Sequence, residues 1–88
     1  MTMEWYIRFK GINPKWQKAY KYQIRYVENY LNYGLTPRST SDIKLIFTNV
    51  IKNEDTIYIT YLNEYGEIVE MMYNTPEKAA YINRITDV

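Results

Sequence analysis

Residues 56–73 read TIYITYLNEYGEIVEMMY, and this stretch decides the fold. Residues 56–62 and 67–73 are rich in β-branched and aromatic side chains, which are enriched in strands. The loop between them, residues 63–66 (NEYG), places Gly66 late, where a hairpin needs a residue that tolerates positive φ. The pattern predicts an antiparallel β-hairpin.

The residues before the hairpin predict a third strand of the same sheet. Residues 42–51 are apolar at most positions on both faces, as is usual for a central strand. Residues 53–55 (NED) form the turn to the hairpin, and so short a loop permits only antiparallel pairing. We therefore expect residues 42–73 to form an antiparallel meander.

A short helix is expected after the meander. The sequence Thr75-Pro76-Glu77 predicts its start, with Thr75 or Asn74 as the N-cap. The apolar residues expected to point inward from this helix are Ala79, Ile82 and Ile85.

Residues 3–10 alternate between apolar and polar side chains, which predicts an N-terminal strand with one buried face. The apolar side carries Met3, Trp5, Ile7 and Phe9. We expect this strand to pair at an edge of the sheet or beside residues 42–51.

A long helix is expected over residues 14–33. Asn13 is suited to the N-cap and Pro14 to the first helical position, where a missing N–H costs nothing. Gly34 fits the position after the helix, and residues 35–41 then form a loop. The predicted fold is a single α+β domain over residues 1–88 in the order β-α-β-β-β-α. An antiparallel sheet of three to four strands packs against the long helix, with a short C-terminal helix added.

On a helical wheel, residues 14–33 divide into three stripes. The expected core stripe holds Trp16, Tyr20, Ile24, Val27 and Leu31. The aromatic stripe holds Tyr22, Tyr26, Tyr30 and Tyr33. The apolar and aromatic arc spans ~200°, twice the ~100° that an ordinary surface helix needs. The tyrosines therefore either pack on the loop of residues 35–41 or on the C-terminal helix, or they are exposed and form a partner-binding surface.

The net charge is +1, but the two halves of the chain differ. Residues 1–40 hold seven basic and two acidic residues, whereas residues 41–88 hold four basic and eight acidic residues, for net charges of +5 and −4. This uneven distribution of charge suggests two candidate binding surfaces. The alternative interpretation is that both are ordinary solvent-exposed surface. The basic face holds Lys15, Lys18, Lys21 and Arg25. The acidic hairpin holds Glu64, Tyr65, Glu67 and Glu70.

No catalytic, cofactor-binding or metal site is expected. The chain has no Cys and no His, which removes thiolates, the commonest general base and the commonest metal ligand. Its three glycines form no phosphate-binding loop. The N-terminus does not resemble a signal peptide, and the longest nearly apolar stretch, residues 43–51, is about half a membrane span. We expect a cytoplasmic protein without cofactors or membrane association.

Three functions remain. The first is a non-enzymatic binding protein that inhibits or modulates a host protein, a phage- or mobile-element-type protein similar in general character to anti-defence and anti-CRISPR proteins. An alternative is a nucleic-acid-binding regulator that uses the basic face of the first helix. A second alternative is a self-associating structural protein, in which a homodimer buries the aromatic stripe.

Overall fold

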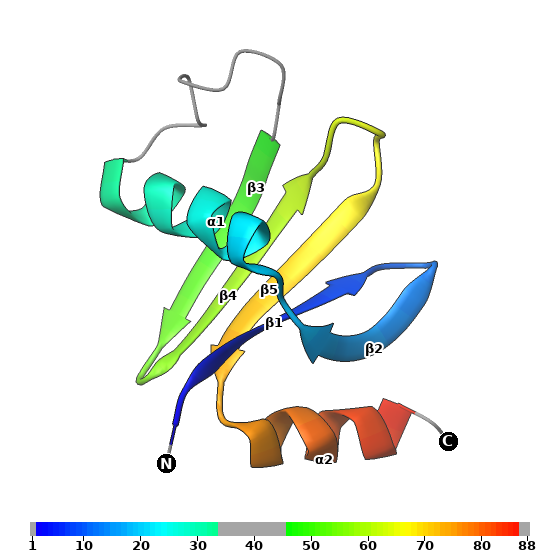
Figure 1. Ribbon diagram of the computed structural model, residues 1–88. Helices are drawn as coiled ribbons and strands as arrows, with labels where there is room; N and C mark the ends of the chain where they lie inside the picture. The colour runs from blue at the N-terminus through cyan, green and yellow to red at the C-terminus, as the bar shows by residue number, and fades with distance from the viewer. Residues whose placement is uncertain (1, 34–45, 87–88) are drawn as a thin grey trace.

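The protein has the expected α+β class, as shown by a computed structural model that describes residues 2–33 and 46–86 (Figure 1). The described chain forms a five-stranded antiparallel sheet and two helices, so the sheet has more strands than predicted. The elements are β1 (Glu4–Phe9), β2 (Asn13–Lys18), α1 (Lys21–Tyr33), β3 (Ile46–Asn53), β4 (Thr56–Leu62), β5 (Ile68–Asn74) and α2 (Pro76–Thr86). The strand order across the sheet is β2-β1-β5-β4-β3.

Residues 13–18 form an edge strand, and the prediction that they begin the long helix is wrong. Gly11, with φ of 86°, makes the turn, and Asn13 starts β2 rather than capping a helix. Pro14 is tolerated because proline is compatible with an edge strand. Tertiary pairing overrides the local capping signal here, because β2 supplies partners for the outer edge of β1 and buries Trp16.

α1 therefore begins later, after Ala19 and Tyr20. The side-chain oxygen of Gln23 accepts a hydrogen bond of 2.8 Å from the Tyr20 backbone N–H. This contact is one half of a capping box, and it satisfies a helix-start donor without a Ser, Thr, Asn or Asp cap. The predicted helix end at Gly34, the loop of residues 35–41 and the predicted start of the next strand at residue 42 lie outside the described residues.

The antiparallel meander is confirmed for β3, β4 and β5. The expectation of a central strand is wrong for β3, which lies at the edge of the sheet. Glu54 and Asp55 form the tight turn between β3 and β4, and Gly66 has the expected positive φ, 77°. The expected position of the first strand is wrong: β1 lies inside the sheet, between β5 and β2. The β1–β2 hairpin accounts for this position, since it adds a strand outside β1.

α1 covers one face of the sheet, and the main core lies between them (Figure 1). The buried residues of this core are Ile7, Val27, Ile59, Tyr61, Val69 and Met71. Val27 is 0% exposed, and the half-buried Ile24 and Leu31 pack beside it, as predicted. Tyr20 was also expected in this core, but it precedes α1 and is 68% exposed.

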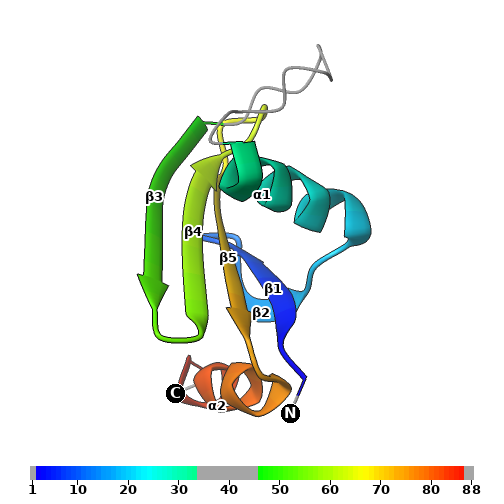
Figure 2. The ribbon, with the colours of Figure 1, turned by 90° about the vertical axis from the view of Figure 1, so that its left-hand side faces the viewer.

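α2 packs against side chains on the other face, across one end of the sheet (Figure 2). The second core consists of Tyr6, Trp16, Met72 and Ala79, with Tyr58 and Ile82 packed against it. Thr75 caps α2 as predicted, because its Oγ1 accepts a hydrogen bond from the Lys78 N–H at 3.2 Å. The expectation that Ile85 points inward is wrong, since this side chain is 54% exposed.

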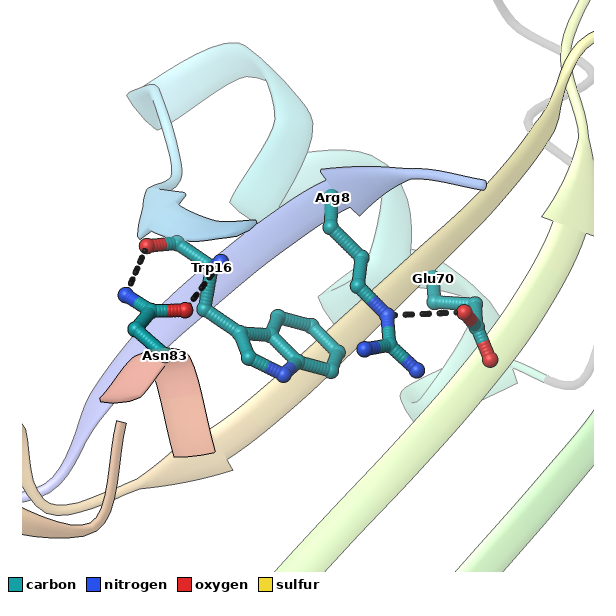
Figure 3. Close-up of polar contacts among 4 residues, drawn as sticks. All are labelled: Arg8, Trp16, Glu70 and Asn83. Atoms are coloured by element: carbon teal, nitrogen blue, oxygen red, sulfur yellow. Dashed lines mark hydrogen bonds and ion pairs between the residues drawn. The ribbon is translucent and has the colours of Figure 1, made fainter. Parts of the chain in front are cut away.

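Trp16 joins β2 to α2 and to the centre of the sheet (Figure 3). The Asn83 amide accepts a hydrogen bond from the Trp16 N–H at 2.8 Å and donates one to the Trp16 carbonyl at 3.0 Å. The Arg8 guanidinium lies 4.5 Å from the centroid of the Trp16 ring, and its Nε donates to Glu70 Oε1 at 2.8 Å. β2 is thus held by an aromatic ring and by side-chain hydrogen bonds as well as by strand pairing.

We predict that Asn83→Ala lowers the free energy of unfolding by about 1–2 kcal/mol, because it leaves two backbone groups of Trp16 without their partners. Urea unfolding followed by circular dichroism measures this loss. Asn32→Ala, at an exposed position of α1, is the matched control and should change stability by less than about 0.5 kcal/mol. Equal stabilities of the two variants would contradict a role of Asn83 in holding β2.

Candidate partner-binding site

A cavity of about 300 Å³ lies between the N-terminal half of α1 and the loop that joins β4 to β5. Its lining residues are Phe9, Tyr22, Gln23, Tyr26, Tyr61, Asn63, Glu64, Tyr65, Glu67 and Val69. The strands supply the floor, α1 supplies one wall and the loop supplies the other. The cavity therefore brings together residues of the predicted aromatic stripe and of the predicted acidic hairpin, which are some 40 positions apart in the sequence.

Asn63 shapes the loop wall of the cavity. Its side-chain oxygen accepts hydrogen bonds from the backbone N–H groups of Tyr65 at 3.0 Å and Glu67 at 2.9 Å. Its amide nitrogen donates to the Glu67 carboxylate at 2.8 Å. Such an Asx-type arrangement fixes the backbone of a short loop. The position of Tyr65, which is 80% exposed, thus follows from a hydrogen-bonded loop.

The aromatic stripe of α1 is divided between the cavity and the core. Tyr22 is 58% exposed, and its ring meets Tyr26 edge-on at a centroid distance of 6.0 Å. Tyr30 instead stacks on Phe47 of the sheet at 4.0 Å. The exposed Tyr20 stacks on Tyr22 at 6.0 Å and extends the accessible aromatic surface. The side chain of the fourth stripe residue, Tyr33, lies outside the described part of the structure.

Tyr61 is the buried ring of the cavity floor. It is 4% exposed, and its hydroxyl lies 3.9 Å from the sulfur of Met71. Burial, together with the smaller effects of the nearby Tyr22 and Tyr26, raises the pKa of Tyr61 from 10.0 to about 12. The hydroxyl therefore stays protonated at neutral pH, so the floor carries no charge.

The four residues of the predicted acidic hairpin do not share one surface. Glu64, Tyr65 and Glu67 line the cavity. Glu70 forms an ion pair with Arg8 through a contact of 2.8 Å. Its strand partner on β1 is Arg8, whereas its neighbours Val69 and Met71 point into the core beneath α1, so Glu70 lies on the opposite face of the sheet.

The four residues of the predicted basic face do not share one helix. Lys15 and Lys18 lie on β2, and only Lys21 and Arg25 lie on α1. The Lys18 ammonium forms an ion pair of 3.0 Å with Glu4. The predicted cationic helix surface is thus reduced to two residues of α1.

Sequence reasoning missed five of the lining residues, namely Phe9, Gln23, Tyr61, Asn63 and Val69. Phe9 pairs across the sheet with Val69, and Val69 pairs with Tyr61, so the three side chains form one row under α1. The period-two pattern of the strands identifies each of them as inward-facing, but the row exists only because β1 pairs with β5. That pairing leaves no local signal in the sequence.

A second, polar cavity of about 430 Å³ lies near the start of α2, and its lining includes both Glu54 and Lys78, so it favours neither sign of charge. Within residues 2–33 and 46–86 no three carboxylates lie close enough to hold a metal ion. Neither helix of this part of the chain has the length and apolar character of a membrane span.

We predict that the free energy of unfolding falls as the pH rises from 10 towards 12. An unfolded tyrosine ionises near pH 10, whereas folded Tyr61 holds its proton up to about pH 12, so unfolding releases a proton in this window. The loss from one such group approaches about 1.4 kcal/mol per pH unit. Urea unfolding at about pH 9 and about pH 11 should show a smaller loss in Tyr61→Phe than in wild type or in the exposed-site control Tyr65→Phe. Identical losses in all three proteins would contradict this assignment.

Comparison of the chain with protein-family models, with curated proteins and with solved structures found no match.

Proposed function

We propose that this chain is a non-enzymatic binding protein that docks on a partner protein through the cavity between α1 and the β4–β5 loop. The observation that carries the proposal is the pair of exposed rings, Tyr22 and Tyr65, on the two walls of one cavity. Tyrosine is enriched at protein interfaces, because a rigid amphipathic ring gives contact area at a low entropic cost.

The surface around the cavity also favours a protein over a nucleic acid. Glu64 and Glu67 line it, and carboxylates repel a phosphate backbone. The alternative of a nucleic-acid-binding helix depended on four cations, of which α1 carries only Lys21 and Arg25. The carboxylates that line the cavity therefore favour a basic region of a partner protein as its ligand. Inhibition or modulation of a host protein remains the prediction made from the residue types.

The proposal predicts that loss of either exposed ring weakens partner binding strongly. Truncating a tyrosine at the centre of an interface costs about 2 kcal/mol, which is roughly 30-fold in Kd. Tagged wild-type protein, Tyr22→Ala and Tyr65→Ala are used to capture partners from a lysate, and the Kd is then measured with the purified partner. Tyr81→Ala, at an exposed ring of α2 outside the cavity, is the matched control and should bind as wild type does.

Two results would contradict the proposal. In one, both cavity variants retain the partner as well as Tyr81→Ala does. In the other, the captured partner is a nucleic acid, which a rise from 50 to 200 mM salt would release with a loss of roughly 100-fold if four phosphates are neutralised.

A further inference from the structure

We propose that the cavity receives the guanidinium group of an arginine side chain. The partner protein would supply this arginine, so the inference rests on the proposed function and adds the chemistry that the cavity recognises. The aromatic lining, the charge of the lining and an intramolecular contact of the same kind elsewhere in the fold support it.

The cavity is rich in aromatic rings. Half of its ten lining residues are rings, contributed by β1, α1, β4 and the β4–β5 loop. These rings are Phe9, Tyr22, Tyr26, Tyr61 and Tyr65. The face of an aromatic ring carries negative electrostatic potential and attracts a cation, most strongly where water is excluded. A set of rings around one cavity is therefore suited to an organic cation.

The formal charge of the lining has a single sign. Glu64 and Glu67 are acidic, and the described lining residues include no Lys and no Arg. Glu67 is held in place by Asn63 at 2.8 Å, whereas Glu64 is exposed at the rim of the cavity. A guanidinium that enters between the rings can donate hydrogen bonds to these carboxylates, and such charge-assisted bonds are about twice as strong as neutral ones.

The protein already holds one of its own arginines in this way (Figure 3). Arg8 lies over the Trp16 ring at 4.5 Å and donates from Nε to Glu70 at 2.8 Å. The planar guanidinium stacks on a ring while its edge donates to a carboxylate, and the compact ammonium of lysine lacks this geometry. The cavity offers the same two kinds of group, rings and carboxylates. Its described lining, however, has no cation that could lie between them as Arg8 lies between Trp16 and Glu70.

N-acetyl-arginine amide is the probe that tests this inference. It is titrated into the ¹⁵N-labelled full chain, and the amide shifts of residues 22–26 and 63–69 are followed. The neutral isostere N-acetyl-citrulline amide and the ammonium compound N-acetyl-lysine amide are titrated in parallel. We expect saturable shifts of both groups of residues, with a Kd for the arginine compound roughly tenfold below that for the citrulline compound.

Variants assign the effect to the cavity. Glu64→Gln should raise the Kd of the arginine compound roughly fivefold, because it removes a carboxylate while keeping the shape of the side chain. Glu28→Gln, which makes the same change at an exposed position of α1 outside the lining, should leave the Kd unchanged. Tyr65→Leu removes a ring without removing charge and should also raise the Kd. Since both cavity positions are exposed, circular dichroism is expected to show folded proteins.

Three results would overturn the inference: equal affinity for the arginine and citrulline compounds, tighter binding of the lysine compound, or no shifts at residues 22–26 and 63–69. None of these three results decides whether the protein binds a partner, because that proposal has a separate test. If Tyr22→Ala and Tyr65→Ala still lose a protein partner, the docking surface stands and only the arginine is refuted. If those variants keep the partner while the arginine compound binds, the cavity recognises guanidinium groups and the docking proposal fails.

Discussion

The burial of Val27 against the sheet is the contact on which the rest of the arrangement depends. Among the α1 side chains that the structure describes, it is the one in the buried part of the main core, and its burial contributes about 1.5–3 kcal/mol. Because Val27 faces the sheet, the rotation of α1 about its axis is set. Tyr22 and Tyr26, four residues apart, then lie on one side of the helix, towards the β4–β5 loop. The packing of Val27 on the sheet therefore determines that Tyr22 and Tyr26 face the cavity.

The β1–β2 hairpin sets where α1 starts. Residues 13–18 pair with β1, so α1 begins at Lys21 and its first turn lies beside the cavity. The same hairpin places Trp16 on the face opposite α1, where α2 and Arg8 hold it. Both faces of the sheet are therefore used: one carries the main core and the cavity, and the other anchors the edge strand.

Much of the fold could be predicted from local signals. The alternation of residues 3–10, the late Gly66 of the hairpin and the Thr75 cap each predict an element, and the structure confirms a strand, a hairpin and a helix at these places. The single buried face predicted for residues 3–10 is wrong, because Tyr6 and Ile7, on opposite faces of β1, are both buried. The strand at residues 13–18 could not be predicted in this way, because Asn-Pro after a glycine is equally a helix start and a hairpin turn. Only the unpaired edge of β1 and the hydrophobic site for Trp16, both tertiary features, decide between them. The site was predictable only in part: three of its five rings (Tyr22, Tyr26 and Tyr65) and both of its carboxylates were identified, but their meeting in one cavity requires the β1–β5 pairing.

Nuclear Overhauser contacts of the Tyr22 and Tyr26 ring protons test most directly whether α1 and the β4–β5 loop form one cavity. We expect cross-peaks from the Tyr26 ring to the main core, which includes Tyr61 and Val69 beside the two ends of the β4–β5 loop, because Tyr26 packs against this core. Cross-peaks from the two rings to residues of α1 alone would contradict this arrangement, and the partner-binding site would then have to be sought elsewhere on the molecule.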